Sequence, residues 1–176
     1  MEHSIGELDR ALEADFVGAV APLFEGAPRF LGRLAAARPF GSLDRLFESA
    51  RSIALEMPED EQIELVDAHP RLGAPPGSVS ALSFVEQGYD REAANEAAEQ
   101  DRARIGRRLA ELNDAYESRF GFRYCVFVAG RSRHELVPAF EEALERDRDA
   151  ELRRALQDVV AIAEARLGAI RTGTSA

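Results

Sequence analysis

The chain has 176 residues, of which 32 are acidic and 22 are basic, and every basic residue is an arginine. The absence of lysine excludes a Walker-type phosphate loop and the pyridoxal or Schiff-base chemistry that needs a lysine amine. The net charge of −10 argues against nucleic acid or an anionic membrane as the main partner, and a single cysteine excludes a disulfide framework.

The composition predicts an all-α protein. Alanine, with 30 copies, dominates the sequence together with Leu, Glu and Arg, which are strong helix formers. A chain of this length suits one domain that buries roughly two-thirds of its unfolded surface. No apolar run reaches the roughly 18 residues of a membrane span, and the first residues lack the order of a signal peptide. We therefore expect a cytoplasmic protein.

Four helices are predicted in the first part of the chain. Apolar residues recur at steps of three and four from Ser4 to Leu23, which predicts one helix there. A second helix is expected over 28–37, after a Gly-Ala-Pro break. Ser42 can cap a third helix, and Pro58, with three acids after it, predicts a fourth that ends at His69.

The remainder begins with a loop rich in proline, glycine and serine over 70–82, followed by a long predicted helix over 91–119. Gly121 is well placed to end that helix as a left-handed cap. The run 122–129, FRYCVFVA, predicts either a strand or a buried extended segment.

Ser132 and Glu135 form a capping box that predicts a helix to about Arg146, and a last helix is expected over 151–170. The sum is seven or eight helices in a single domain spanning 1–176. Residues 1–3 and 171–176 are expected to be flexible.

His69 is the first candidate for chemistry. The following Pro70 disfavours helical backbone at His69, so the imidazole should lie where a helix gives way to a loop. The helix dipole at that end favours the imidazolium form, and a histidine there can act as a general acid or base. Arg71 can bring a positive fork toward an anionic substrate. The alternative is a histidine that only caps carbonyls.

A second candidate is the pair Glu86 and Gln87, which follows Ser83. Together they could accept from and donate to the polar edges of a small heterocycle. The alternative interpretation is a capping box, because Ser-x-x-Glu is its signature and needs no active site.

Three further features are set aside. The sequence at His134 begins like a helical zinc motif, but Pro138 stands where the second histidine is needed, so no metal site is expected. The glycine-rich loop over 73–80 has no lysine. Cys125 lies in an apolar run and is expected to be a small buried hydrophobe.

In their order along the chain, these residues resemble the 2-oxo-4-hydroxy-4-carboxy-5-ureidoimidazoline (OHCU) decarboxylase family. The resemblance covers nearly the whole chain and is carried by several short motifs: Phe24-Glu25-Gly26-Ala27-Pro28, Ala68-His69-Pro70-Arg71-Leu72-Gly73, Ser83-x-x-Glu86-Gln87, Leu112-Asn113-x-x-Tyr116, Phe120-Gly121-Phe122 and Arg166-Leu167.

The resemblance implies an all-α, commonly dimeric enzyme that converts its ureidoimidazoline substrate to S-allantoin in urate catabolism without a cofactor. It implies that His69 is the general acid/base, assisted by Glu86 as a second catalytic residue. It also implies a set of substrate-binding residues: Pro70, Ser83, Gln87, Phe122, Arg123, Tyr124, Cys125, Val126 and Arg166.

Two alternatives remain open from the sequence. Arg29 and Arg123 stand where the family often has other residues, which would favour a related enzyme that hydrolyses another ureide. A non-catalytic helical binding module is the second alternative, although His69, Glu86 and Gln87 are all intact.

Overall fold

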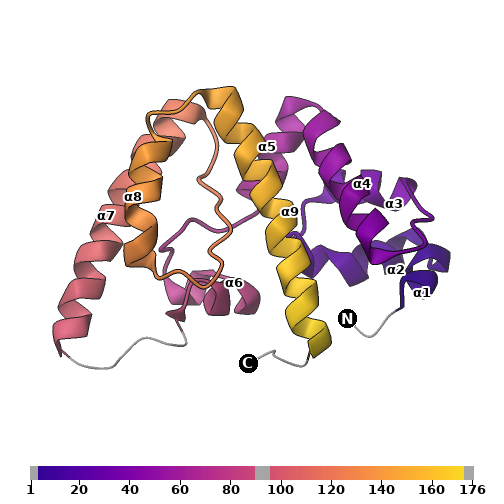
Figure 1. The fold of residues 1–176 in the computed structure, drawn as a ribbon, viewed down its shortest axis with the longest axis horizontal. Helices are drawn as coiled ribbons and strands as arrows, with labels where there is room; N and C mark the ends of the chain where they lie inside the picture. The colour runs from indigo at the N-terminus through magenta and orange to yellow at the C-terminus, as the bar shows by residue number, and fades with distance from the viewer. Residues whose placement is uncertain (1–3, 90–95, 173–176) are drawn as a thin grey trace. The chain divides into compact units, whose positions relative to one another are not determined.

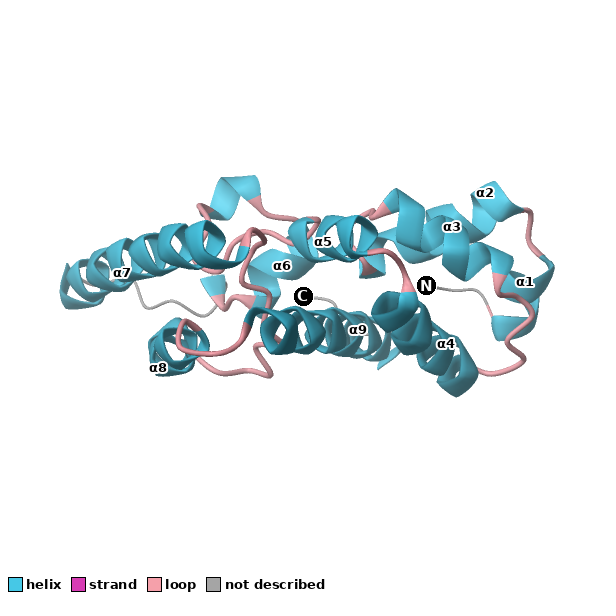
Figure 2. Cartoon of the chain, turned by 90° about the horizontal axis from the view of Figure 1, so that it is seen from above, coloured by secondary structure: helices cyan, strands magenta, loops and turns pink. Residues whose placement is uncertain are grey.

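The computed structural model describes residues 4–89 and 96–172, and within these ranges every regular element is a helix (Figure 2). The all-α prediction is therefore confirmed. The described residues form nine α-helices, α1 to α9, against the seven or eight predicted, together with two short 3-10 turns, η1 and η2. The predicted flexibility of residues 1–3 and 173–176 lies outside the described residues. Arg171 and Thr172, expected in the flexible tail, belong to the last helix.

The chain divides into two compact units. The first comprises the residues up to His69 together with those from Leu152 onward, and the second runs from Pro70 to Glu151. Helix α9 (Arg148–Thr172) begins in the second unit and continues through the first.

The first unit contains α1 (Ile5–Arg10), α2 (Glu13–Val20), η1 (Ala21–Leu23), α3 (Pro28–Ala36), α4 (Leu43–Glu56) and α5 (Glu59–Asp67), packed with most of α9 (Figure 1). Ser42 caps α4 by accepting the N–H of Arg45, as expected. The core is built from apolar side chains of all these helices, including Phe16, Phe30, Leu34, Phe47, Leu65 and Val159, each at most 3% exposed.

The single helix predicted over 4–23 is wrong, because the chain breaks at Ala11 between α1 and α2. Arg38 stabilises the break from a distance: its Nη1 donates to the carbonyls of Leu8 (3.1 Å) and Ala11 (2.8 Å). Carbonyls at a helix end need such partners, and this one comes from about 30 residues further along the chain. Sequence periodicity alone cannot reveal it.

The second unit contains η2 (Pro76–Ser78), α6 (Ala81–Glu86), α7 (Glu96–Phe120) and α8 (Arg133–Ala143). Residues 91–95, predicted as the start of the long helix, lie outside the described residues. Gly121 has the expected left-handed conformation (φ 80°), and the Ser132–Glu135 capping box is present. Of the two options for 122–129, the buried extended segment is confirmed, since no strand is formed there.

Tyr116 is the centre of the second unit's core. Its ring makes edge contacts with Phe120, Phe122, Tyr124 and Phe140, with centroid distances from 4.5 to 5.7 Å. Its hydroxyl donates to a carboxylate oxygen of the fully buried Glu151 at 2.8 Å. Such aromatic pairs each contribute about 0.5–1.5 kcal/mol beyond the burial of their area. This cluster fixes the extended segment against α7 and α8.

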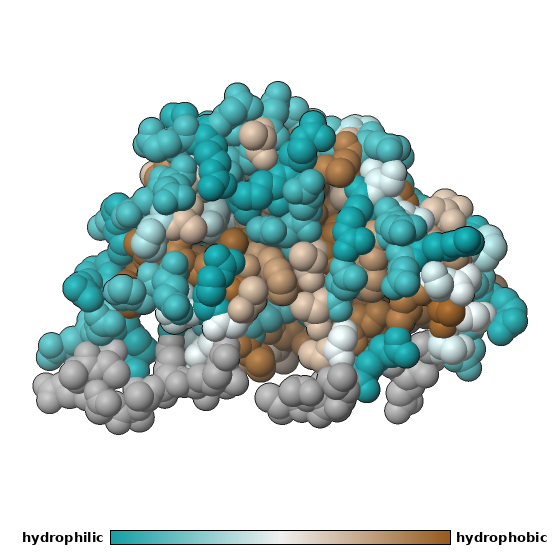
Figure 3. All heavy atoms as spheres, viewed as in Figure 1, coloured by the Kyte–Doolittle hydropathy of each residue, from teal (hydrophilic) through white to brown (hydrophobic). Residues whose placement is uncertain are grey.

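Over α7 and α8, the visible surface is mostly hydrophilic (Figure 3). Arg108 of α7 forms an ion pair with Glu141 of α8 (2.6 Å), which joins the two helices at that surface. Within the residues described, no helix combines the length and the apolar character that crossing a membrane requires.

Candidate active site

His69 lies just past the end of α5 and is 4% exposed. Its ring Nδ1 is 3.3 Å from the carbonyl oxygen of Leu65, one turn earlier. A carbonyl only accepts, so Nδ1 carries the proton in this contact, and the lone pair of the neutral ring is on Nε2. The position at a helix end agrees with the sequence prediction.

The charge state expected for His69 from the helix dipole is wrong. Burial lowers the pKa of His69 to about 4; the positive charge of Arg166 adds to this, while Glu25 and the Leu65 carbonyl act in the opposite direction. The free-energy penalty of burying an imidazolium is larger here than the stabilisation it would gain from the helix C-terminus. His69 is therefore a neutral imidazole at neutral pH.

Arg166, on α9, is 3% exposed and lies close enough to His69 for its charge to act on the imidazole. Its guanidinium donates to the carbonyls of Pro22 (3.1 Å) and Leu23 (3.2 Å) and to Glu25 Oε1 (2.8 Å). The side chains that surround His69 in the first unit thus include an arginine whose charge is partly compensated by one carboxylate.

Glu25 lies in the Phe24–Pro28 motif but is not among the predicted site residues. Its backbone adopts a left-handed conformation (φ 53°), which is unfavourable for a residue with a side chain. In this conformation, Glu25 Oε1 accepts a hydrogen bond from Arg166 Nη2 at 2.8 Å. Backbone strain of this kind is often found at functional sites.

The second unit holds the other candidates, beginning with α6. The helix is capped by Ser80, whose hydroxyl accepts the N–H of Ser83 at 3.2 Å. Ser83 itself lies inside the helix and is 3% exposed, so the capping-box interpretation of Ser83 and Glu86 is wrong. Glu86 is the last residue of α6 and is partly exposed. Neither Ser83 nor Glu86 is therefore needed to cap the N-terminus of α6, because Ser80 does so.

Gln87 directly follows α6 and is 8% exposed. Its Oε1 accepts the backbone N–H of Gly73 at 2.8 Å, and its Nε2 donates to the carbonyl of Arg71 at 3.3 Å. The side-chain amide therefore lies against the loop that follows Pro70. The hydroxyl of Tyr89 also lies 3.5 Å from Oε1, a longer contact than that of Gly73. The amide nitrogen has two hydrogens, so Nε2 can make one hydrogen bond besides that to Arg71.

Arg71 does not lie where its sequence position led us to expect. Its guanidinium forms a two-pronged ion pair with Glu117 of α7 (2.7 and 2.6 Å) and a further contact with Asp114 at 3.0 Å. These carboxylates raise the pKa of Arg71 further. The fork predicted to meet an anionic substrate instead binds the loop to α7.

The extended segment supplies five predicted substrate-binding residues. Phe122, Tyr124 and Cys125 are buried, whereas Arg123 and Val126 are partly exposed. The ring of Tyr124 stacks on Phe140 at 3.7 Å. The segment forms neither a helix nor a strand, so its backbone N–H and C=O groups are not used in regular secondary structure.

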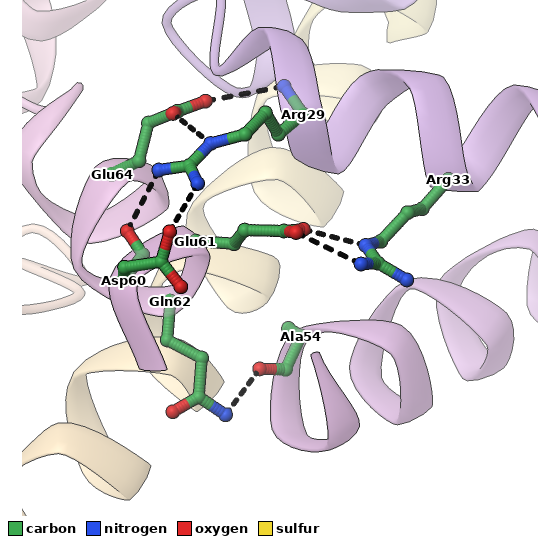
Figure 4. A network of polar contacts seen from close by, with 7 residues as sticks. All are labelled: Arg29, Arg33, Ala54, Asp60, Glu61, Gln62 and Glu64. Atoms are coloured by element: carbon green, nitrogen blue, oxygen red, sulfur yellow. Dashed lines mark hydrogen bonds and ion pairs between the residues drawn. The ribbon is translucent and has the colours of Figure 1, made fainter. Parts of the chain in front are cut away.

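Arg29, a departure from the family pattern, takes part in a polar network between α3 and α5 (Figure 4). Its side chain pairs with Asp60 and Glu64, and its backbone N–H donates to Glu64 at 3.1 Å. Arg33, one turn later, pairs with Glu61. Through these contacts Arg29 joins α3 to α5, the helix that leads to His69.

No group of three or more His, Cys, Asp or Glu side chains in residues 4–89 and 96–172 is arranged to hold a metal ion.

Comparisons with known proteins agree with the motifs. A family model described as OHCU decarboxylase matches residues 9–168. The 2-oxo-4-hydroxy-4-carboxy-5-ureidoimidazoline decarboxylase of Haloferax volcanii is 28% identical over 166 residues, covering 94% of this chain and 95% of that protein. A uric acid degradation bifunctional protein of a Bacillus species is 25% identical and covers 92% of this chain, which spans only 31% of that protein.

Two solved structures share the fold. A crystal structure of an OHCU decarboxylase in the presence of (S)-allantoin matches with a TM-score of 0.66 at 23% identity, over 86% of this chain and 96% of that one. A crystal structure of an (S)-allantoin synthase matches with a TM-score of 0.63 at 19% identity, over 94% of this chain and 53% of that one.

Proposed function

This chain belongs to the OHCU decarboxylase family, and from that premise we propose how its residues carry out the reaction. It is a carbon–carbon lyase of urate degradation, which removes CO2 from 2-oxo-4-hydroxy-4-carboxy-5-ureidoimidazoline and leaves S-allantoin. The observation that carries the proposed mechanism is the buried, neutral His69, whose Nδ1 is directed at the Leu65 carbonyl.

The substrate provides its own electron sink. When the bond to the carboxylate breaks, the electron pair passes into the conjugated C=N of the ring, and CO2 leaves. The ring hydroxyl then loses its proton to become a carbonyl, and the neighbouring ring carbon gains one. One proton thus moves from oxygen to carbon, and the ring nitrogen that receives the electron pair takes up one further proton from solvent. The reaction is proposed to need no cofactor, and the lysine-free chain forms no lysine imine.

His69 is proposed to move that proton. A neutral imidazole with its lone pair on Nε2 can accept the hydroxyl proton as a base and return it to carbon as an acid. The contact between Nδ1 and Leu65 O holds the ring in one tautomer. Delivery from one fixed side of the ring accounts for a single enantiomer of the product.

Arg166 and Glu25 are proposed to tune this step. Arg166 is predicted to meet a polar group of the substrate, and its charge already lowers the pKa of His69. A substrate carboxylate near Arg166 would offset that charge, so that the pKa of His69 rises when the substrate binds and falls when CO2 departs. Such a change favours proton uptake first and proton release afterwards.

The remaining contacts are proposed for the second unit. Glu86 is proposed as a second catalytic residue that accepts N–H groups of the ureido chain or ring while the reaction proceeds. Gln87 is proposed to complement an N–H and a C=O of the substrate. Pro70, Ser83 and the segment 122–126 are proposed to shape the substrate-binding site, with backbone groups of Phe122, Arg123, Tyr124, Cys125 and Val126 in contact with it.

The test generates the substrate with urate oxidase and the hydrolase that follows it, adds this protein, and records circular dichroism. Rapid formation of one allantoin enantiomer is expected. His69→Asn should lower kcat by about 10²- to 10⁴-fold, as expected for the loss of a general acid/base. His134→Asn removes an exposed histidine on α8 and is the matched control. Slow, racemic product with the wild-type protein would refute the proposal.

The family resemblance also supports a cytoplasmic homodimer, which sedimentation of the purified protein would test by its mass. Hydrolysis of another ureide gains no support from Arg29, because that side chain pairs with α5. No observation favours this second function.

A further inference from the structure

Side chains bind four backbone polar groups of the loop Arg71–Ala74, in addition to the hydrogen bond from the Ala74 N–H to the Arg71 carbonyl (3.1 Å) within the loop. Gln87 accepts from the Gly73 N–H and donates to the Arg71 carbonyl. The carbonyl between them, that of Leu72, accepts from Asn113 Nδ2 at 3.0 Å. The Ala74 carbonyl accepts from the hydroxyl of Tyr89. Three side chains thus bind four consecutive residues of backbone.

Asn113 is the member of this set that comes from α7. It is 2% exposed, and its Nδ2 donates both to Leu72 O and, at 2.7 Å, to Leu109 O one turn earlier in the helix. Both partners are carbonyls, which only accept, so the amide has a single possible orientation. The amide therefore fixes the Leu72 carbonyl to a rigid helix.

The loop in turn fixes the orientation of the Gln87 amide. Gly73 presents a donor and Arg71 an acceptor, so the oxygen of Gln87 faces one and its nitrogen the other. The two loop atoms that bind the Gln87 amide, the Arg71 carbonyl oxygen and the Gly73 nitrogen, lie on either side of the Leu72 carbonyl in the chain, and Asn113 binds that carbonyl. If the Leu72 carbonyl moves, the spacing between these two atoms changes, and the amide loses its defined direction.

Gly73 leaves the loop little freedom on the side of α7. Its φ is +80°, and a Cβ built on it would lie 2.8 Å from Leu109 Cδ1. The loop backbone therefore touches α7 one turn before Asn113. Close packing and the hydrogen bond hold the same short segment in one place.

We infer that Asn113 is a positioning residue, which acts through the Leu72 carbonyl to fix the side-chain amide of Gln87 in the orientation that binds an N–H and C=O pair of the substrate. This inference rests on the proposed function for the role of Gln87 with substrate. It goes beyond it in assigning a role to Asn113, which contacts the loop and not the reacting atoms.

Asn113→Ser isolates the contact to Leu72. A serine hydroxyl within a helix reaches the carbonyl one turn earlier, so the bond to Leu109 is kept and the bond to Leu72 is lost. We expect KM to rise about 5- to 20-fold, as for the loss of one hydrogen bond to a well-placed group, with kcat changed less than 2-fold. Asn113→Ala should likewise raise KM while leaving kcat nearly unchanged.

A double-mutant cycle separates positioning from a general loss of structure. In a Gln87→Ala background, Asn113→Ser should change KM less than 2-fold, because the side chain through which it acts is gone. Gln62→Ala is the matched control: its amide also donates to two carbonyls, those of Ala54 and Leu55, and part of this contact is drawn in Figure 4. It should leave KM unchanged. An equal rise of KM in both backgrounds, or a fall in kcat alone, would overturn the inference.

Hydrogen exchange of the Gly73 amide, followed by NMR, gives a second measurement that needs no turnover. Exchange should become faster in Asn113→Ser and in Gln87→Ala and stay unchanged in Gln62→Ala. Unchanged protection of Gly73 in Asn113→Ser would overturn the inference whatever the activity. Failure of the proposed function would appear differently, as a wild-type protein that does not accelerate decarboxylation.

Discussion

Acid should destabilise this protein through His69 before most other groups take effect. The perturbation is a change of pH from 7.5 to 4 in the wild-type protein and in His69→Asn, which has no titrating group at this position. The burial that lowers the folded-state pKa of His69 to about 4 does not exist in the unfolded chain, where the ordinary value of 6.5 applies.

The sign follows from which state binds the proton first. As the pH falls below 6.5, the unfolded chain takes up a proton at His69 while the folded protein does not, so the unfolded state is favoured. The two pKa values differ by 6.5 − 4 = 2.5. At about 1.4 kcal/mol for each pH unit, the wild-type protein loses roughly 3 kcal/mol through His69 by pH 4.

The assay is urea unfolding followed by far-ultraviolet circular dichroism at several pH values. Carboxylates that protonate over the same range act equally in both proteins, so the difference between wild type and His69→Asn isolates the histidine. That difference should be constant above pH 6.5 and change by roughly 3 kcal/mol toward pH 4. His134→Asn, which replaces an exposed histidine of α8 by the same residue type, is measured alongside as the control substitution.

Parallel curves for wild type and His69→Asn would refute this argument. They would mean that the imidazole is protonated as easily in the folded protein as in the unfolded chain. In that case burial would not lower the pKa of His69, and the account of its charge state given above would be wrong.

Three further predictions concern stability and are measured by urea unfolding at pH 7.5. Gly73→Ala should cost about 1–3 kcal/mol, because φ is +80° and the new methyl group would meet Leu109; a change below 0.5 kcal/mol would contradict this. Tyr116→Phe should cost about 1–3 kcal/mol, because the buried Glu151 loses a hydrogen bond of 2.8 Å, and an unchanged midpoint would be the contrary result. Arg29→Ala should lower the midpoint only slightly at low salt, and the difference should disappear near 1 M NaCl, since its partners on α5 are ion pairs at the surface. An equal loss at both salt concentrations would show that packing, not charge, is what Arg29 contributes.

Local signals predicted much of the secondary structure because their physical causes are local. Ser42 and Ser132 cap the helices that follow them, and Gly121 ends α7 in the left-handed conformation, each through contacts within a few residues. The interruption after α1 was not predictable in this way. It depends on Arg38, which reaches back to carbonyls about 30 residues earlier in the chain.

For the site, the sequence identified the candidate residues but not their states. His69 was expected to be favoured as a cation, and only the burial around it shows that it is neutral. Arg71 was expected to face a substrate, but Asp114 and Glu117 lie one turn apart on α7 and bind it there. Charge state and side-chain direction depend on neighbours that are distant in sequence.

The sequence by itself determined the helical class, through alanine- and leucine-rich periodicity, and the family, through motifs in a fixed order. The lack of lysine likewise excluded imine chemistry without any coordinates. The tertiary structure alone decided that His69 is buried beside Arg166 and Glu25, and that Asn113 and Gln87 hold the same loop. Composition and short-range spacing record what each residue is, whereas pKa values and hydrogen-bond partners arise only when residues far apart in the chain are packed together.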